Sequence, residues 1–392
     1  MSTERVVTAI RDCARSGAAL RISGGGSWLD AGRPVSAERL LPMREDSGVV
    51  SYVAGDLTLT VRAGTSLSEI DEITREHDQW LPLDPYGTPD GTLGATLATA
   101  SAGPLASSFG LPRDLVLGLE FVTGRGEVVR GGGKVVKNVA GFDLSRLLTG
   151  SWGTLGVITE VTLRLYARPA VDRTFWIELA GNEGQIAAAV RAIISSPLAP
   201  FAFVLLNRSA AGAIGLGDKP VGLIRFGGND AAVRAQIAAL SQISRPQEMG
   251  TETWLKVRQL DDQAHSTIRV SSLPRRISAV AGKILSDDVP SLRNCIDPRR
   301  GVIRVIAAAG ESAGTPEWSP NVFFKSEDED HSSEVIFEKL PADVWPLVSP
   351  TVVNDGLSRR VKDAFDPFNI LNPGILGPLN HAVNADSPGR LN

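Results

Sequence analysis

Three glycine-rich blocks within the first 160 residues constrain the fold of this chain more than any other feature of its sequence. They occupy residues 23–27, 91–103 and 150–156, and each lies at the end of a predicted strand or in a turn. Because glycine has no Cβ atom, successive backbone N–H groups can point inward and surround phosphate oxygens. One such block usually marks only a tight turn, so the order and spacing of all three carry the signal.

Two better-known phosphate-binding motifs are not matched. The run Gly24–Leu29 lacks the third glycine of the dinucleotide-binding fingerprint. The run Gly131–Lys134 is followed by Val135, where a P-loop has Ser or Thr. A classical NAD or ATP site is therefore not expected.

Length and composition limit the classes of protein to which this chain can belong. Its 392 residues exceed the roughly 250–300 at which a single core usually divides, so two domains are expected. The formal net charge is −4, and no run of Lys or Arg suits a nucleic acid. An apolar signal segment and a stretch of about 18 uncharged apolar residues are both absent. We expect a cytoplasmic protein without a transmembrane segment, reaching the inner membrane only through partners.

The few cysteines and histidines exclude several kinds of site. Cys13 and Cys295 cannot form a disulfide framework, and an iron–sulfur cluster needs about four thiolates. The four histidines are scattered and show no metal-ligand spacing. No metal site is predicted, and an iron–sulfur cluster has to belong to another protein.

The predicted elements change in character after Pro169. Before it, residues 115–130 predict a β-hairpin around a Gly-Arg-Gly turn, and Ser66–Glu69 is a helix capping box. After it, the elements follow the β-α-β-β-α order of a ferredoxin-like layer. They are strands at 174–179, 201–206 and 221–226 and helices at 183–194 and 231–243. A second domain is expected there.

The three blocks, in this order and spacing, resemble the FAD-binding domain of the vanillyl-alcohol oxidase family, also called the p-cresol methylhydroxylase (PCMH) type. The matching stretches are Ile22–Trp28, Thr92–Gly103 and Gly150–Ile158, with support from the tail Phe365–Gly374. The resemblance implies an α+β protein: a PCMH-type FAD-binding domain of two α/β subdomains, followed by a ferredoxin-like α+β cap domain. The expected domains are 1–169 for FAD, 170–350 for a cap that meets substrate or a partner, and 351–392 for a segment returning to the FAD domain.

The resemblance also implies which residues surround the cofactor. In the family the first block holds the pyrophosphate, the second flanks the pyrophosphate and the isoalloxazine, and the third lies at the adenosine end. The implied FAD contacts are Ser23, Gly24, Gly25, Gly26, Ser27, Trp28, Thr92, Leu93, Gly94, Ala95, Ser101, Gly103, Gly141, Gly150, Gly153, Gly156, Val157, Ile158 and Asn372. The first block has no His and neither Cys lies in a block, so non-covalent binding of FAD is expected.

One branch of the family fits best. The stretches Arg113–Gly118 and Lys134–Gly150 resemble the FAD-binding E subunit of bacterial glycolate oxidase. Self-contained D-2-hydroxy-acid dehydrogenases of the superfamily have a paired-His metal site and a Glu-His-Gly stretch. Both are absent here, which argues against independent oxidation of glycolate or lactate. The resemblance implies an oxidoreductase subunit in a hetero-oligomer with a second flavoprotein. Such a subunit passes electrons from oxidation of a 2-hydroxy acid to an iron–sulfur partner.

No catalytic residue follows from the sequence, and each of three candidates has a structural alternative. Lys137 or Asn138 polarises the pyrimidine edge of the flavin, or the pair is a solvated turn Lys and a helix-capping Asn. Arg269 holds a substrate carboxylate by a bidentate contact, or it is a solvent-facing or ion-paired Arg on a strand.

Two other functions stay open beside the electron-passing subunit. One is a self-sufficient FAD-dependent oxidase or dehydrogenase that acts on an alcohol or a 2-hydroxy acid, with its base in the second domain. The other is a structural subunit that keeps the flavin fold and stabilises a partner without catalysis of its own.

Overall fold

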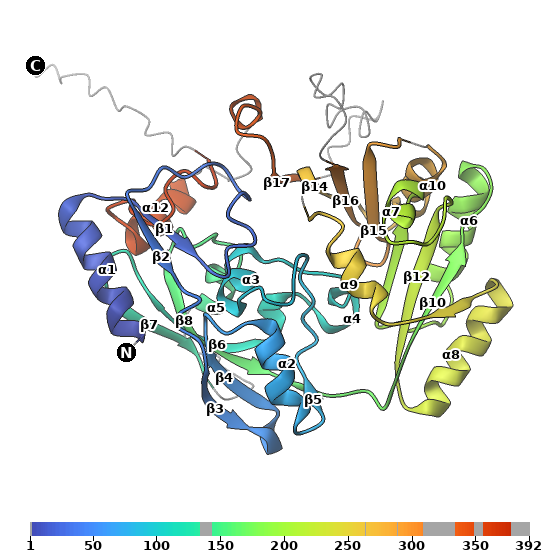
Figure 1. Ribbon diagram of the computed structural model, residues 1–392, viewed down its shortest axis with the longest axis horizontal. Helices are drawn as coiled ribbons and strands as arrows, with labels where there is room; N and C mark the ends of the chain where they lie inside the picture. Colours follow the sequence, from blue (N-terminus) through green and yellow to red (C-terminus); the bar gives the residue numbers. More distant parts are fainter. Residues whose placement is uncertain are drawn as a thin grey trace, which may run out of the picture.

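Two β-sheets divide the computed structural model of this chain into two lobes. The structure describes residues 2–133, 143–262, 264–287, 289–308, 334–348 and 356–377. In Figure 1 the lobe with the five-stranded sheet lies on the left, and the lobe with the eight-stranded sheet on the right. Lys137, Asn138 and Gly141 fall outside the described residues, so their roles stay predictions.

The first lobe is built on an antiparallel sheet with the strand order β3-β4-β8-β6-β7. Its strands are β3 (Val49–Val53), β4 (Thr58–Arg62), β6 (Val116–Val122), β7 (Val128–Gly132) and β8 (Val157–Arg164). The predicted hairpin is confirmed as the β6–β7 pair. The core between the sheet and its helices is apolar; the helices are α2 (Leu67–Arg75), α3 (Leu93–Thr99) and α5 (Leu144–Leu148).

The predicted capping box at the start of α2 is confirmed. Ser66 Oγ accepts from the backbone N–H of Glu69 at 3.2 Å, and the Ser66 N–H donates to Glu69 Oε2 at 2.7 Å. The backbone N–H groups of Ser66 and Glu69 therefore both have partners, and this fixes the start of α2 beside the second glycine block.

A smaller parallel pair, β1 (Leu20–Ser23) and β2 (Arg39–Pro42), packs on helix α1 (Ser2–Ser16). Val6, Ile10 and Cys13 recur at helical spacing and are fully buried in this contact. Cys13 is therefore a core residue. Because β1 leads directly into the first glycine block, this packing fixes where the block begins.

The described tail returns to the first lobe and extends its smaller pair of strands. Helix α12 (Gly356–Phe365) is followed by residues that lie beside β1. The N–H of Leu20 donates to the carbonyl of Ile370 at 2.7 Å, and the N–H of Asn372 donates to the carbonyl of Leu20 at 3.0 Å. The tail is thus bonded to the strand that opens the first glycine block.

The buried carboxylate of Asp366 organises this tail. It accepts from Lys362 Nζ at 2.6 Å, from the N–H of Leu371 at 2.9 Å and from the N–H of Ile370 at 3.2 Å. Lys362 Nζ also donates to the carbonyl of Thr154 at 2.8 Å, which ties α12 to the third glycine block. Burial lowers the pKa of Lys362, and Asp366 opposes this shift.

The second lobe contains one antiparallel sheet with the order β13-β10-β12-β11-β15-β16-β14-β17. Its strands are β10 (Val171–Glu178), β11 (Ala202–Leu206), β12 (Val221–Gly228), β13 (Gln247–Met249), β14 (Ala264–Ser271), β15 (Leu292–Asp297), β16 (Val302–Ala308) and β17 (Glu334–Lys339). Its helices include α6 (Glu183–Ile194), α7 (Arg208–Ala213), α8 (Asp230–Ile243), α9 (Thr253–Arg258) and α10 (Ile277–Ser286).

The eight strands form two halves with the same connectivity. Each half places its fourth, first, third and second strands side by side, as in a ferredoxin-like layer: β13-β10-β12-β11 and, from the opposite edge, β17-β14-β16-β15. The sequence predicted only the first half. The halves join where Leu205 pairs with Ile296 and Leu206 with Cys295, so neither β11 nor β15 is left as an open edge.

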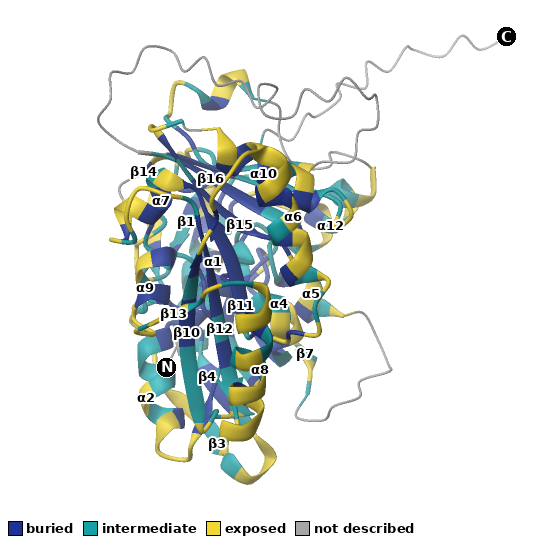
Figure 2. Cartoon of the chain, turned by 90° about the vertical axis from the view of Figure 1, so that its right-hand side faces the viewer, coloured by how far each residue is buried: buried dark blue, intermediate teal, exposed yellow. Residues whose placement is uncertain are grey.

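The eight-stranded sheet is buried on both faces. One face packs on α6, α8 and α10. The other packs on α7 and α9 and, where the lobes meet, on Trp80, Leu105 and Phe109 of the first lobe. Figure 2 shows the buried strands in dark blue and the exposed sides of the helices in yellow. The second lobe is therefore held against the first by a continuous apolar contact.

Polar contacts reinforce the boundary between the lobes. Arg258 of α9 donates from Nε to the carbonyl of Pro85, and the N–H of Gly87 donates to the carbonyl of Arg258, each at 2.8 Å. The buried Asp84 carboxyl accepts from the N–H of Leu105 at 3.1 and 3.2 Å. Burial raises the pKa of Asp84 to about 6, and the charge of Arg258 opposes the shift only in part.

The chain passes between the lobes near the predicted domain boundary. β5 (Gln79–Trp80) pairs with β9 (Tyr166–Ala167), and β10 of the second sheet begins four residues later at Val171. The predicted boundary between residues 169 and 170 lies in this link. None of the helices in the described part of the chain combines the length and the apolar character that a membrane span requires.

We expect Asp366→Ala to destabilise the fold strongly. The variant leaves the buried Lys362 ammonium without its partner and removes the acceptor of two backbone N–H groups. Breaking a buried pair in this way costs about 3–5 kcal/mol. The measurement is denaturant unfolding followed by circular dichroism. The matched control is Asp363→Ala, which removes the same charge from an exposed position of α12, the helix that ends just before Asp366, and should change the free energy of unfolding by about 0.5 kcal/mol or less. Equal losses in the two variants would refute the role given to Asp366.

Candidate functional site

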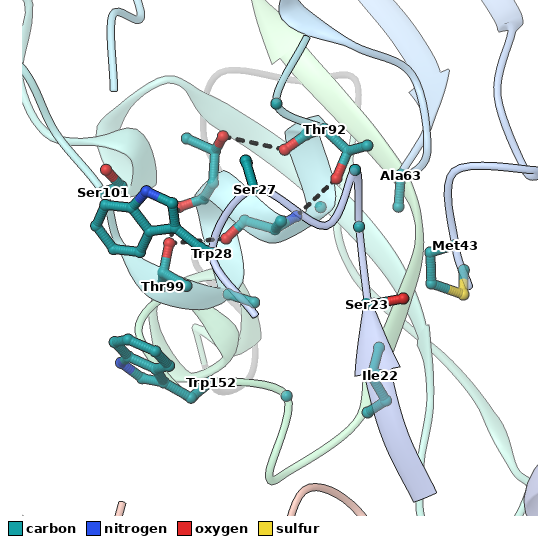
Figure 3. Close-up of a pocket in the computed structure, with 18 of the residues that line it drawn as sticks. Ile22, Ser23, Ser27, Trp28, Met43, Ala63, Thr92, Thr99, Ser101 and Trp152 are labelled. Carbon is teal, nitrogen blue, oxygen red and sulfur yellow. Dashed lines mark hydrogen bonds between the residues drawn. The ribbon is translucent and has the colours of Figure 1, made fainter. Parts of the chain in front are cut away.

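The three glycine-rich blocks meet at one cavity of the first lobe. The cavity is open to solvent, and residues from all three blocks form its wall. Figure 3 shows its wall, with Ile22 and Ser23 on β1 and with Thr92, Thr99 and Trp152 from the other blocks. The predicted contact residues that line it are Ser23, Gly24, Gly25, Gly26, Ser27, Trp28, Thr92, Gly94, Ala95, Ser101, Gly153, Gly156, Val157, Ile158 and Asn372. Their contact with a cofactor stays a prediction.

Three of the described residues that were predicted to contact FAD do not line this cavity. Each of them instead has a role in packing or in the backbone structure around it. Leu93 is fully buried because α3 turns this side chain into the core of the lobe. Gly103 lies so close to the backbone at Asp84 that a Cβ atom would come within 1.8 Å of the Asp84 carbonyl oxygen. Gly150 has φ +83° and donates its N–H to the carbonyl of Leu97 at 3.0 Å, which fixes the end of α5 against α3.

Several lining residues were not predicted from the sequence. Thr96 and Thr99 follow Thr92 and Ala95 on one face of α3, so recognising residues 93–99 as a helix would have found them. Others lie in or beside the glycine blocks and were not singled out; they are Arg21, Ile22, Leu29, Gly91, Ala98 and Trp152. The rest come from other segments and carry no local signal; they are Met43, Ala63, Pro85, Tyr86, Thr88 and Ile375.

The first two glycine blocks are closely packed against their neighbours. A Cβ atom on Gly24 would lie 2.2 Å from Thr92 Oγ1 and 2.8 Å from the Cβ of Ala95. A Cβ atom on Gly94 would lie 2.8 Å from the Cβ of Ala63. Real Cβ atoms do not approach neighbours this closely, so glycine is required at both positions.

Consecutive N–H groups of the first block are left available to a ligand. Within the described residues, the N–H groups of Gly24, Gly25, Gly26 and Ser27 donate to no backbone carbonyl. Gly24 is half-buried and Gly25, Gly26 and Ser27 are exposed, so an entering ligand can reach their N–H groups. Four successive free donors at a cavity wall are therefore suited to the oxygens of an anion.

The side chain of Asn372 joins the first and third blocks. Its Oδ1 accepts from the N–H of Ile22 at 2.9 Å, and its Nδ2 donates to the carbonyl of Trp152 at 2.8 Å. Trp152 has φ +53° and Gly153 φ +70°, so the third block turns sharply here. A Cβ atom on Gly153 would lie 2.9 Å from Asn372 Nδ2. The two blocks and the tail are thereby held at a fixed separation across the cavity.

The wall chemistry fits a ligand with a central pyrophosphate and flat ring systems. Among the described residues, Arg21 Nη1 and Ser101 Oγ are buried, line the cavity and have no hydrogen-bond partner. Arg21 Nη2 donates to the carbonyl of Leu29 at 3.1 Å, which orients the guanidinium, and burial lowers the pKa of Arg21. A cation and free N–H groups suit phosphate oxygens. Apolar walls from Ile158 and Ile375 suit ring faces.

Arg269 forms an ion pair, which is the structural alternative to substrate binding that the sequence left open. It lies on β14 with Nε 3.2 Å from Glu338 Oε1. It does not line the cavity where the three blocks meet.

Comparisons with known proteins agree with this geometry. Residues 1–132 match a family model described as an FAD binding domain. Over 205 residues, 43% of this chain, the sequence is 36% identical to glycolate oxidase subunit GlcE of Escherichia coli (strain K12), and the match covers 58% of that subunit. In an aligned stretch of length 416 that covers 95% of this chain, it is 25% identical to glycolate oxidase subunit GlcD of Bacillus subtilis (strain 168), and that match covers 87% of the subunit.

The solved structures identify the fold. A structure of p-cresol methylhydroxylase with substrate bound matches 96% of this chain and 87% of its own length, with a TM-score of 0.70 and 15% sequence identity. At this identity the likeness concerns the fold alone. The predicted fold class, a PCMH-type FAD-binding domain followed by an α+β cap, is confirmed.

Replacing Gly24 by Ala should impair retention of FAD. The added methyl group meets Thr92 and Ala95, so the first block has to move away from the second. Overpacking of this kind costs about 1–3 kcal/mol, and we expect FAD to bind about 10–100-fold more weakly. The measurement is fluorescence titration of the apoprotein with FAD. Gly55→Ala is the matched control, because nothing lies within 4 Å of the Cβ position at Gly55. Equal FAD affinity in the two variants would show that the close approach at Gly24 is not needed.

Proposed function

We propose that this chain, whose residues 1–132 match an FAD binding domain, is an FAD-dependent oxidoreductase and the FAD-holding subunit of a glycolate-oxidase-type complex. In this proposal, electrons from oxidation of a 2-hydroxy acid reach the flavin of this subunit. They leave it for an iron–sulfur partner. FAD, when bound, supplies the chemistry that accepts an electron pair and releases electrons singly.

The observation that carries the proposal is a cavity whose wall suits FAD, in a chain whose two cysteines are buried in separate cores. Cys13 is buried in the core beside α1, and Cys295 lies in the core of the second lobe. Two separate buried thiols cannot hold an iron–sulfur cluster. One-electron transfer onward to an iron–sulfur cluster therefore requires another protein. The likeness of part of this chain to a glycolate oxidase subunit indicates which kind.

We propose that FAD is held without a covalent bond. Among the described residues, no Cys or His lines the cavity of the three blocks. His77 packs against the ring of Tyr52 with centroids 5.1 Å apart, and His265 is exposed. The cofactor is retained through the N–H groups of the first block, the guanidinium of Arg21 and the fixed spacing that Asn372 provides. These groups orient the pyrophosphate.

A self-sufficient oxidase is the second candidate, and one observation favours it. A second cavity, between the lobes, adjoins the first and is lined by Arg304, Asp261 and Glu338 of the second lobe. A substrate bound there would lie beside the cofactor. The complex is preferred because Arg304 is already engaged by the two carboxylates and does not offer a free cation to a 2-hydroxy acid.

The proposal is tested by reducing the bound FAD with substrate. Glycolate or D-lactate added to the purified FAD-loaded protein should leave the flavin absorbance unchanged. Bleaching should begin only after a catalytic flavoprotein subunit and an iron–sulfur subunit of the complex are added. Dithionite serves as the control that the bound flavin can be reduced. Rapid bleaching by either acid with this protein alone would support the self-sufficient oxidase and overturn the proposal.

A further inference from the structure

One edge of the five-stranded sheet is an uncharged, apolar strand. That strand is β3, and among the described strands it pairs only with β4. Its sequence, Val-Val-Ser-Tyr-Val, contains no charged residue and no proline. Figure 1 shows β3 at the lower left of the first lobe, next to β4. Along its other side, no strand of the described chain is hydrogen-bonded to it.

The other edge strands of this chain are protected against pairing. A free sheet edge can pair with a strand of another molecule, and proteins usually prevent this with charged side chains or proline. Among the described edge strands of three or more residues, all except β3 carry a charge. These charged residues are Arg21 on β1, Arg39 on β2, Arg130 on β7, Glu248 on β13 and Glu334 on β17. The edge at β3 lacks this protection.

Apolar side chains gather at the unprotected edge. Val49, Val50 and Val53 are 45%, 44% and 39% exposed, and Leu57, in the turn that follows, is 37% exposed. The register between β3 and β4 shifts at Val50, so Val50 is not paired with β4. Single exposed apolar residues are ordinary on protein surfaces. Four of them within residues 49–57, beside an open strand edge, form an apolar patch.

The backbone at Leu57 adds a second cost. Its φ of +54° lies in the left-handed region, which favours glycine or asparagine over leucine. Two hydrogen bonds fix this turn: the N–H of Leu57 donates to the carbonyl of Ala54 at 3.1 Å, and its carbonyl accepts from the N–H of Leu165 at 2.7 Å. Leu57 belongs to none of the apolar cores of the described chain. Packing within the chain therefore does not explain a leucine here, whereas contact with another molecule does.

The charge pattern indicates which strand can pair with this edge. Paired strands place their side chains directly opposite one another, and burying a charge against valine costs free energy. Any other described edge of three or more residues would bring an Arg or a Glu to the contact. A second copy of β3 brings no charge. Two identical strands can pair antiparallel about a twofold axis, which covers the apolar patches of both copies at once.

We propose that β3 pairs with β3 of a second copy of this chain, so that the two five-stranded sheets form one continuous sheet across a dimer. The apolar patch of each copy packs against that of the other. None of its residues lines the FAD cavity, so dimerisation leaves that cavity open. The proposal goes beyond the proposed function, because it rests neither on FAD nor on a subunit of another kind. A contact of this size is weak, with a dissociation constant of about 1–100 μM.

The test is sedimentation velocity of the FAD-loaded protein over a dilution series from about 200 to 1 μM. The protein should change from dimer to monomer across the series. Hydrogen exchange of residues 49–53, measured by mass spectrometry at both ends of the series, should be slower in the dimer because pairing protects backbone N–H groups.

Three results would overturn the proposal. The first is a monomer at every concentration. The second is a dimer in which hydrogen exchange of residues 49–53 does not change. The third is protection of these residues only after other subunits of a complex are added, which would assign the edge to a different protein.

A matched pair of variants assigns the dimer contact to β3. Val53→Lys places a charge on the open edge and should raise the dissociation constant of the dimer about 10-fold or more. Leu40→Lys is the control, because Leu40 is also an exposed apolar residue on an edge strand, β2, and should leave the dissociation constant unchanged. Circular dichroism and FAD content show that both variants are folded. Equal dissociation constants in the two variants would remove the contact from β3.

A third variant separates the contact from the stability of the fold. Leu57→Asn removes the apolar side chain and suits the left-handed backbone. The dissociation constant of the dimer should rise about 10-fold, while the free energy of unfolding of the monomer should not fall. A less stable monomer with an unchanged dissociation constant would show that Leu57 serves the fold and not the dimer.

Discussion

The amide of Asn372 is the contact on which the FAD site depends. It joins the N–H of Ile22 to the carbonyl of Trp152, so a residue of the tail holds two glycine blocks that are more than 100 positions apart in the sequence. Each block alone is a short loop with few side chains to anchor it. Because the cofactor is expected to be held mainly by backbone N–H groups, the distance between the blocks matters more than the identity of most lining side chains. Asp366 and Lys362 extend this arrangement by fixing the tail itself.

The face of the eight-stranded sheet that meets the first lobe has an apolar part and a polar part. Its apolar part packs on Trp80 and Leu105 and positions the lobe, while its polar part lies over the edge of the FAD cavity. If this face served packing alone, all of its strands would carry apolar side chains there. On three neighbouring strands this face instead carries Thr267, Arg304 and Glu338. One part of the face therefore serves packing, and the other part lines a cavity.

The sequence predicts the features that depend on local chemistry. The glycine blocks, the capping box at Ser66 and the β6–β7 hairpin follow from residue types at fixed spacing, and the structure has them in place. Features that depend on long-range packing were missed. Leu93 lies inside a glycine block but points into the core, and Met43 and Ala63 reach the cavity from distant strand ends. The second ferredoxin-like half and the Arg304 cluster depend on strand register, which no short motif reports.

The most direct test of this account is the affinity of the apoprotein for FAD with and without the Asn372 amide. Asn372→Ala removes the acceptor of one buried N–H and the donor to one carbonyl, which costs about 1–3 kcal/mol. Fluorescence titration should therefore show FAD binding about 10–100-fold more weakly than in the unaltered protein, while the circular dichroism spectrum stays the same. An unchanged affinity would contradict the claim that this amide sets the spacing of the cradle.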